Sequence, residues 1–136
     1  MKKYLIFLFA AIVLHTLAFS QSEKYEGAMK TNLALFDSAK TVEDFTKLAN
    51  TFERIGEAEK TQWLPYYYAA LALSTAGWMP ALADKDANAD RTNALCDKAD
   101  AAAVTDADKA EILAIRNMAA TQQMLVDPQT RFMSYG

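Results

Sequence analysis

The stretch DANADRTNALCD places four oxygen-bearing side chains at the spacing of a calcium-binding loop. Asp86, Asn88, Asp90 and Asp97 occupy its first, third, fifth and twelfth positions. Such a loop wraps carboxylate and amide oxygens around one hard cation, and its last position is an acid that binds through both oxygens. The spacing makes these four residues candidate calcium ligands.

The same stretch departs from a calcium loop at its sixth position, where glycine normally makes the sharp turn. That position is Arg91, whose positive charge would lie beside the ion. The register resembles the loop of EF-hand and dockerin-type modules, but dockerins duplicate the loop and no second copy is present. Asp and Asn also favour the first turn of a helix. We therefore expect a helix over residues 87–103 with Asp86 as its cap, and calcium binding is the alternative.

An aromatic band formed by WLPYYY and the later Trp78 is a second candidate site. An exposed aromatic groove could hold a peptide or stack on sugar rings. Three successive tyrosines cannot all face inward from one helix, so we expect Trp63 and Tyr67 in the core and Tyr68 at a helix–helix seam. Tyr66, at another seam, and Trp78 are expected to stay accessible, and they are the partner-binding candidates.

Residues suited to catalysis are scarce. The only histidine is His15, which lies in the N-terminal leader described below, and the only cysteine is Cys96. A mature chain without histidine cannot use a histidine base, and it lacks the usual zinc and copper ligand sets. Only Lys98 lies near Cys96 in sequence to activate it, so we expect a buried thiol, with an intermolecular disulfide as the alternative. The sequence predicts a non-enzymatic protein without a cofactor. A hydrolase based on paired carboxylates is a further alternative, since Asp and Glu are abundant, but nothing marks any pair as special.

The N-terminus has the layout of a secretory signal peptide. Lys2 and Lys3 precede an apolar run over residues 4–14, and small residues at Ala18 and Ser20 precede a cut after Ser20. The run is shorter than the roughly 20 residues of a membrane span. We expect residues 1–20 to be removed during export to the periplasm or the exterior, leaving a domain over residues 21–136. An uncleaved anchor is the alternative.

The charge of the mature chain argues against nucleic acid as a partner. Without Lys2 and Lys3, the 14 basic residues fall to 12 against 17 acidic residues, which leaves a net charge of −5. Phosphate binding needs clustered Lys and Arg. Contact with a membrane is expected only through the leader during export.

The mature chain is predicted to be all-α, because glycine and proline are few, alanine is frequent and no segment alternates polar and apolar residues. Five helices are expected, over residues 23–39, 42–55, 61–77, 87–103 and 105–126. The residues expected to start or end them are the capping boxes Thr41–Asp44 and Thr105–Asp108, the cap Thr61, and the stops Gly56, Gly77 and Asp127-Pro128.

Short gaps between helices favour antiparallel neighbours, so hairpins stacked side by side are expected. The segments LANTFERIGEAEKTQWLPYYYAALA and DPQTRFMSYG, behind a leader ending in SQ, resemble a family of exported, Bacteroidota-like bacterial proteins with tetratricopeptide-like helical repeats. The resemblance implies an extracytoplasmic interaction module with no active site to carry over. Relatives continue past Tyr135-Gly136, so the fifth helix is expected to lack its hairpin partner.

Two explanations are open for that unpaired helix. Either the domain over residues 21–136 is truncated at its C-terminus, which we favour, or the exposed face pairs with another molecule, including a second copy. The predicted function is a non-enzymatic, exported module for protein–protein interaction or scaffolding in the periplasm, with an unidentified protein or peptide as its partner. The alternative is a calcium-binding interaction module that uses Asp86, Asn88, Asp90 and Asp97.

Overall fold

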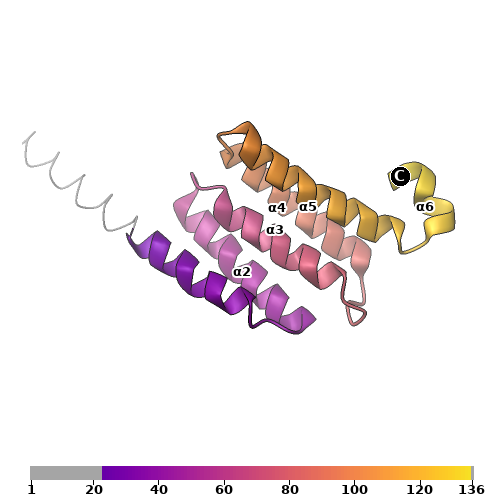
Figure 1. Ribbon diagram of the computed structural model, residues 1–136, viewed down its shortest axis with the longest axis horizontal. Helices are drawn as coiled ribbons and strands as arrows, with labels where there is room; N and C mark the ends of the chain where they lie inside the picture. Colours follow the sequence, from indigo (N-terminus) through magenta and orange to yellow (C-terminus); the bar gives the residue numbers. More distant parts are fainter. Residues whose placement is uncertain (1–22, 136) are drawn as a thin grey trace, which may run out of the picture.

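The computed structural model describes residues 23–135, and within that range every regular element is an α-helix (Figure 1). A first helix covers residues 23–36. The helices that follow are α2 (Val42–Glu59), α3 (Leu64–Gly77), α4 (Lys85–Ala102), α5 (Asp106–Met124) and α6 (Pro128–Tyr135). The all-α prediction is confirmed. The predicted signal peptide, residues 1–20, lies outside the described residues.

The two predicted capping boxes are present. At the start of α2, the Asp44 backbone N–H donates to Thr41 Oγ1 at 3.1 Å, and the Thr41 N–H donates to Asp44 Oδ2 at 3.0 Å. Thr105 and Asp108 repeat this arrangement at the start of α5, at 3.1 and 2.9 Å. Hydrogen bonds from the backbone N–H groups of Lys40 and Thr41 lower the pKa of Asp44. These boxes begin both helices where the sequence predicted.

The predicted boundary between the second and third helices is wrong. Gly56 does not end α2, which continues for three more residues and closes at Lys60 in the left-handed conformation (φ 52°). Thr61 does not cap the third helix, because its hydroxyl donates to the Glu59 carbonyl at 3.2 Å. Trp63 stands at the N-cap of α3 without a side-chain hydrogen bond, and proline occupies the first turn as predicted.

The fourth helix also begins differently from the prediction. Asp84, not Asp86, is its N-cap, and the Asp84 carboxylate accepts from the Ala87 N–H at 2.9 Å. Beyond α5, the sequence predicted no helix, yet Pro128 begins α6. Proline at the first position of a helix lacks only an N–H that would be unpaired there anyway, so Asp127-Pro128 both ends one helix and starts another.

Gly56 is required by the close approach of α2 and α3. A Cβ at this position would lie 2.7 Å from Cε1 and 2.8 Å from Cζ of Tyr66. The Tyr66 ring packs over the glycine and is only 6% exposed. Gly77 has a similar role at the end of α3, where an added Cβ would overlap the side-chain amide of Gln122 on α5. Both glycines therefore leave room for a large neighbour.

The core follows the row of helices and is richest around α3. Side chains from the first helix to α5 contribute, and Phe36 meets Phe45 edge-on with ring centroids 5.5 Å apart. The most completely buried large side chains include Phe52, Leu73 and Ile112. No described helix has both the length and the apolar character needed to cross a membrane.

From the first helix to α5, consecutive helices lie side by side in alternating directions (Figure 1). Helix α3 also contacts α5, and side chains of α2 and α4 meet directly. Alternate helices therefore share a layer, with α3 and α5 in one and α2 and α4 in the other. The short helix α6 packs at one end, next to α5.

Candidate partner-binding surface

The acidic stretch that resembles a calcium loop is helical, because it lies within α4. On this helix Asp86, Asp90 and Asp97 share one face but are spread over about 16 Å of its length, and Asn88 lies on the opposite side. Each contacts a different group, and the partners of Asp86, Asn88, Asp90 and Asp97 are, in that order, Arg131 of α6, the Leu73 carbonyl of α3, Gln123 of α5 and Arg116 of α5. The four side chains thus tie α4 to three other helices and do not converge on one point.

No group of three or more His, Cys, Asp or Glu side chains within the described part of the chain is arranged to hold a metal ion. The sixth loop position, Arg91, donates to Asn50 Oδ1 at 2.6 Å and to Glu53 at 3.2 Å. The residues singled out for calcium, and the arginine among them, therefore serve helix packing in this conformation.

Tyr66 is not accessible, and that prediction is wrong. Its ring fills the space above Gly56 on α2, and Lys98 Nζ lies 5.6 Å from the ring centroid. Burial raises the pKa of its hydroxyl. Trp78 is accessible as predicted, with 47% of its surface exposed, and it follows directly after α3. Of the two partner-binding candidates, only Trp78 has a surface that a partner could reach.

Exposed apolar side chains concentrate at one end of the helical stack. Among the described residues, eight large hydrophobic side chains are exposed. Five of them form what we call the apolar end: Trp78 (47%), Leu125 (50%), Val126 (45%), Phe132 (62%) and Met133 (91%). Apart from Trp78, these residues were not predicted from the sequence. The spacing of apolar residues along a helix does not show which of its faces has no neighbouring helix.

Polar contacts hold the elements of the apolar end together. Lys85 Nζ at the start of α4 donates to the Gly77 carbonyl at 2.6 Å, next to Trp78. At the next residue of α4, Asp86 accepts two hydrogen bonds of 2.6 and 2.9 Å from Arg131 of α6. The start of α4 therefore lies beside the end of α3 and also holds helix α6, whose Arg131 is 45 positions further along the chain.

Helix α5 is fixed to the same end by two glutamines. Gln123, 7% exposed, donates to Asp90 Oδ1 of α4 at 3.1 Å. Gln122, 2% exposed, donates to the Ser74 carbonyl of α3 at 2.8 Å. Buried amides need such partners, because an unpaired polar group in the interior is costly. The two side chains set the position of α5 against its neighbours.

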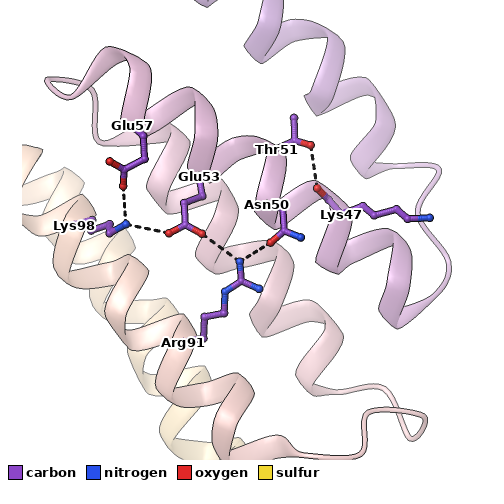
Figure 2. A network of polar contacts seen from close by, with 7 residues as sticks. All are labelled: Lys47, Asn50, Thr51, Glu53, Glu57, Arg91 and Lys98. Carbon is purple, nitrogen blue, oxygen red and sulfur yellow. Dashed lines mark hydrogen bonds and ion pairs between the residues drawn. The ribbon is translucent and has the colours of Figure 1, made fainter.

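A network of polar contacts joins α2 to α4 (Figure 2). Lys98 binds Glu53 at 3.0 Å and Glu57 at 2.6 Å, and Arg91 binds the other oxygen of Glu53 at 3.2 Å. An open groove of about 650 Å³ runs along α2 beside these pairs, where Asn50 accepts from Arg91. The charged groups of this network neutralise each other across the two helices.

The electrostatics of this network are those of a structural bridge. Burial acts to raise the pKa of Glu53, but hydrogen bonds from Lys98 and Arg91 outweigh it, and the pKa lies below its usual value. Hydrogen bonds to Glu57 and Glu53 raise the pKa of Lys98. Glu53 and Lys98 are therefore charged and paired at neutral pH. Pairs this exposed contribute about 0.2–1 kcal/mol each.

Cys96 is buried, as predicted, and is 1% exposed in α4. Burial raises the pKa of its thiol to about 11, and the nearby guanidinium of Arg116 only partly opposes this. The thiolate is the reactive form of cysteine, so the side chain is a small apolar packing group and is poorly suited to act as a nucleophile.

No protein-family profile, curated protein or solved structure matches this chain.

Proposed function

We propose that the protein is a non-enzymatic, exported helical-repeat module that binds a protein partner in the periplasm. One observation carries the proposal: of the eight large hydrophobic side chains that are exposed within residues 23–135, five lie at the apolar end, at the termini of α3 and α5 and on α6. Exposed apolar side chains gathered at one end of a molecule favour contact with another macromolecule. Met and aromatic residues, which make up three of the five, are also enriched at protein interfaces.

The packing of the helices supports a tetratricopeptide-like arrangement within this proposal. Each helix contacts the next, and α3 additionally contacts α5, as helices at equivalent places of stacked hairpins would. Gly56 lies beneath the ring of Tyr66, and a small residue facing a large one in this way allows such hairpins to pack closely. Repeat arrays of this kind commonly present extended surfaces to protein partners.

The α2–α4 network is a weaker candidate for the binding surface. Its carboxylates and cations already bind each other, so a partner would have to break those pairs to use them (Figure 2). The apolar end needs no such rearrangement, because its side chains are in water. Burying them gains about 25 cal/mol for each Å² removed from water.

The proposal is tested by retention of a partner from the envelope fraction. We compare the full chain with a Phe132→Ser/Met133→Ser variant and with Val104→Ser. Val104 is a matched control, because it is 85% exposed and lies in the α4–α5 connector, at the opposite end of the stack from α6 (Figure 1). We expect a protein that is retained by the wild type and by Val104→Ser but lost by the double variant.

The retained protein is then titrated by calorimetry against the same three chains. An affinity that Phe132→Ser/Met133→Ser leaves unchanged would refute the apolar end as the binding surface. Sedimentation of the purified chain over a concentration series identifies the case in which the partner is a second copy. Association that the double variant abolishes and Val104→Ser preserves would assign the surface to self-assembly.

A further inference from the structure

Helix α6 is anchored to the stack in an unusual way. Of its side chains from Pro128 to Ser134, Arg131 is the only one that is not exposed. Phe132 and Met133, the residues that would normally attach a short helix to a core, are 62% and 91% exposed. The apolar side of α6 therefore faces outward, and a charged residue faces the protein.

Arg131 reaches two other helices. Its guanidinium binds both carboxylate oxygens of Asp86, at 2.6 and 2.9 Å, in the forked geometry that favours arginine and carboxylate pairs. The same Nη1 atom donates to the Gln123 carbonyl near the end of α5 at 3.1 Å. One side chain thus bridges the first turn of α4 and the last turn of α5.

The helix itself is too short to be stable alone. Isolated helices below about 12–15 residues are marginal in water, and α6 has 8. Asp127 supports its first turn, where it accepts from the Thr130 N–H at 3.4 Å. Since apolar burial contributes little, the attachment of α6 depends strongly on its polar contacts.

We propose that Asp86 and Arg131 form a clasp that holds α6 closed on the α4–α5 end, and that α6 opens as a unit when the clasp is broken while α2–α5 stay folded. Segments with few buried apolar contacts are the ones that open locally in native proteins. The clasp fixes Phe132 and Met133 relative to Trp78, Leu125 and Val126, so it sets the shape of the apolar end. Only the effect of the clasp on the apolar end rests on the proposed function. The opening of α6 itself is measurable without a partner.

Hydrogen exchange followed by mass spectrometry tests the clasp in the intact chain. The variants are Asp86→Asn and Arg131→Gln, alone and together. Asp97→Asn is the matched control, because it removes the same charge from the same helix and breaks an aspartate–arginine pair away from α6, a single contact to Arg116 at 2.8 Å. Loss of the forked pair should lower amide protection in residues 129–135 by about tenfold or more.

The expected pattern is specific to the clasp. Each single variant lowers protection over α6, the double variant lowers it no further, and protection within α3 and α5 stays at the wild-type level. Asp97→Asn leaves α6 unchanged. Wild-type protection of α6 in both single variants would overturn the proposal, as would a wild-type α6 that exchanges without protection. Loss of protection by the same factor throughout α2–α5 would also overturn it, because that pattern means global destabilisation.

Discussion

Replacement of Gly56 by alanine should destabilise the protein, against the usual effect of that substitution. In the interior of an exposed helix, Gly→Ala stabilises by about 1 kcal/mol, because alanine loses less backbone entropy on folding. Gly56 lies within α2 and has no left-handed backbone conformation that would call for glycine. Its role is to leave space for the Tyr66 ring.

The size of the effect follows from that space. A Cβ at Gly56 would lie 2.7, 2.8 and 3.0 Å from three ring carbons of Tyr66. Carbon atoms in contact prefer about 3.5–4.0 Å, so the ring or the helix must shift. Tyr66 is 6% exposed and has little room to move. Overpacking of this kind costs about 1–3 kcal/mol, which exceeds or offsets the propensity gain and leaves a net loss of roughly 1 kcal/mol.

Gly27→Ala is the matched control. Gly27 lies in the first described helix, is exposed, and has nothing within 4 Å of an added Cβ. It should gain roughly 0.5–1 kcal/mol, so that the two substitutions differ by about 2 kcal/mol in opposite directions. The free energy of unfolding is measured by urea denaturation with far-ultraviolet circular dichroism.

A third variant tests the cause of the loss. Tyr66→Leu removes the ring carbons that a Cβ would meet, so Gly56→Ala should cost much less in that background, with a coupling of about 1 kcal/mol or more. The reasoning is refuted if Gly56→Ala stabilises the chain as Gly27→Ala does. It also fails if the cost of Gly56→Ala is the same with leucine at position 66.

Three further substitutions test the packing and caps in the same unfolding assay. Because the thiol of Cys96 has a pKa raised from 9.0 to about 11, the stability of the wild type relative to Cys96→Ala should fall by roughly 2 kcal/mol between pH 9 and 11, and a constant difference would contradict a buried thiol. Thr105→Ala should cost about 1 kcal/mol by removing the α5 cap, whereas Thr121→Ala, late in the same helix, should change stability little; equal effects would argue against the cap. Gly77→Ala should cost about 1–3 kcal/mol through overlap with Gln122, and part of that loss should be recovered when Gln122→Ala is added. If the effects of the two substitutions on the free energy of unfolding simply add in the double variant, the overlap is ruled out.

Features that depend on a few neighbouring residues could be predicted from the sequence. The capping boxes at Thr41 and Thr105 were identified because each uses a hydroxyl and a carboxylate three residues apart. The helical state of the acidic stretch followed from similar local preferences. The sequence placed its cap at Asp86 and the structure places it at Asp84, because both are acids near the start of the same helix and spacing alone does not separate them.

Features that depend on tertiary contacts could not be predicted in this way. Helix α3 is apolar around most of its circumference, so no polar stripe showed which of Tyr66, Tyr67 and Tyr68 faces inward. The Asp86–Arg131 pair joins residues 45 positions apart, and nothing in the local sequence links them. Helix α6 was missed for another reason, since proline was taken as a stop and its preference for a first turn was overlooked.

The ion pairs between α2 and α4 have a consequence for how the stack unfolds. In an array where each helix touches only the next, unfolding can begin at either end and advance one helix at a time. Here Glu53 connects two helices that are not consecutive, and α3 and α5 also touch. Such second-neighbour coupling makes α2 to α5 unfold together. Cooperative unfolding should therefore include α5 but not α6. The boundary between the helices that unfold together and the helix that frays should fall in the short connector before Pro128.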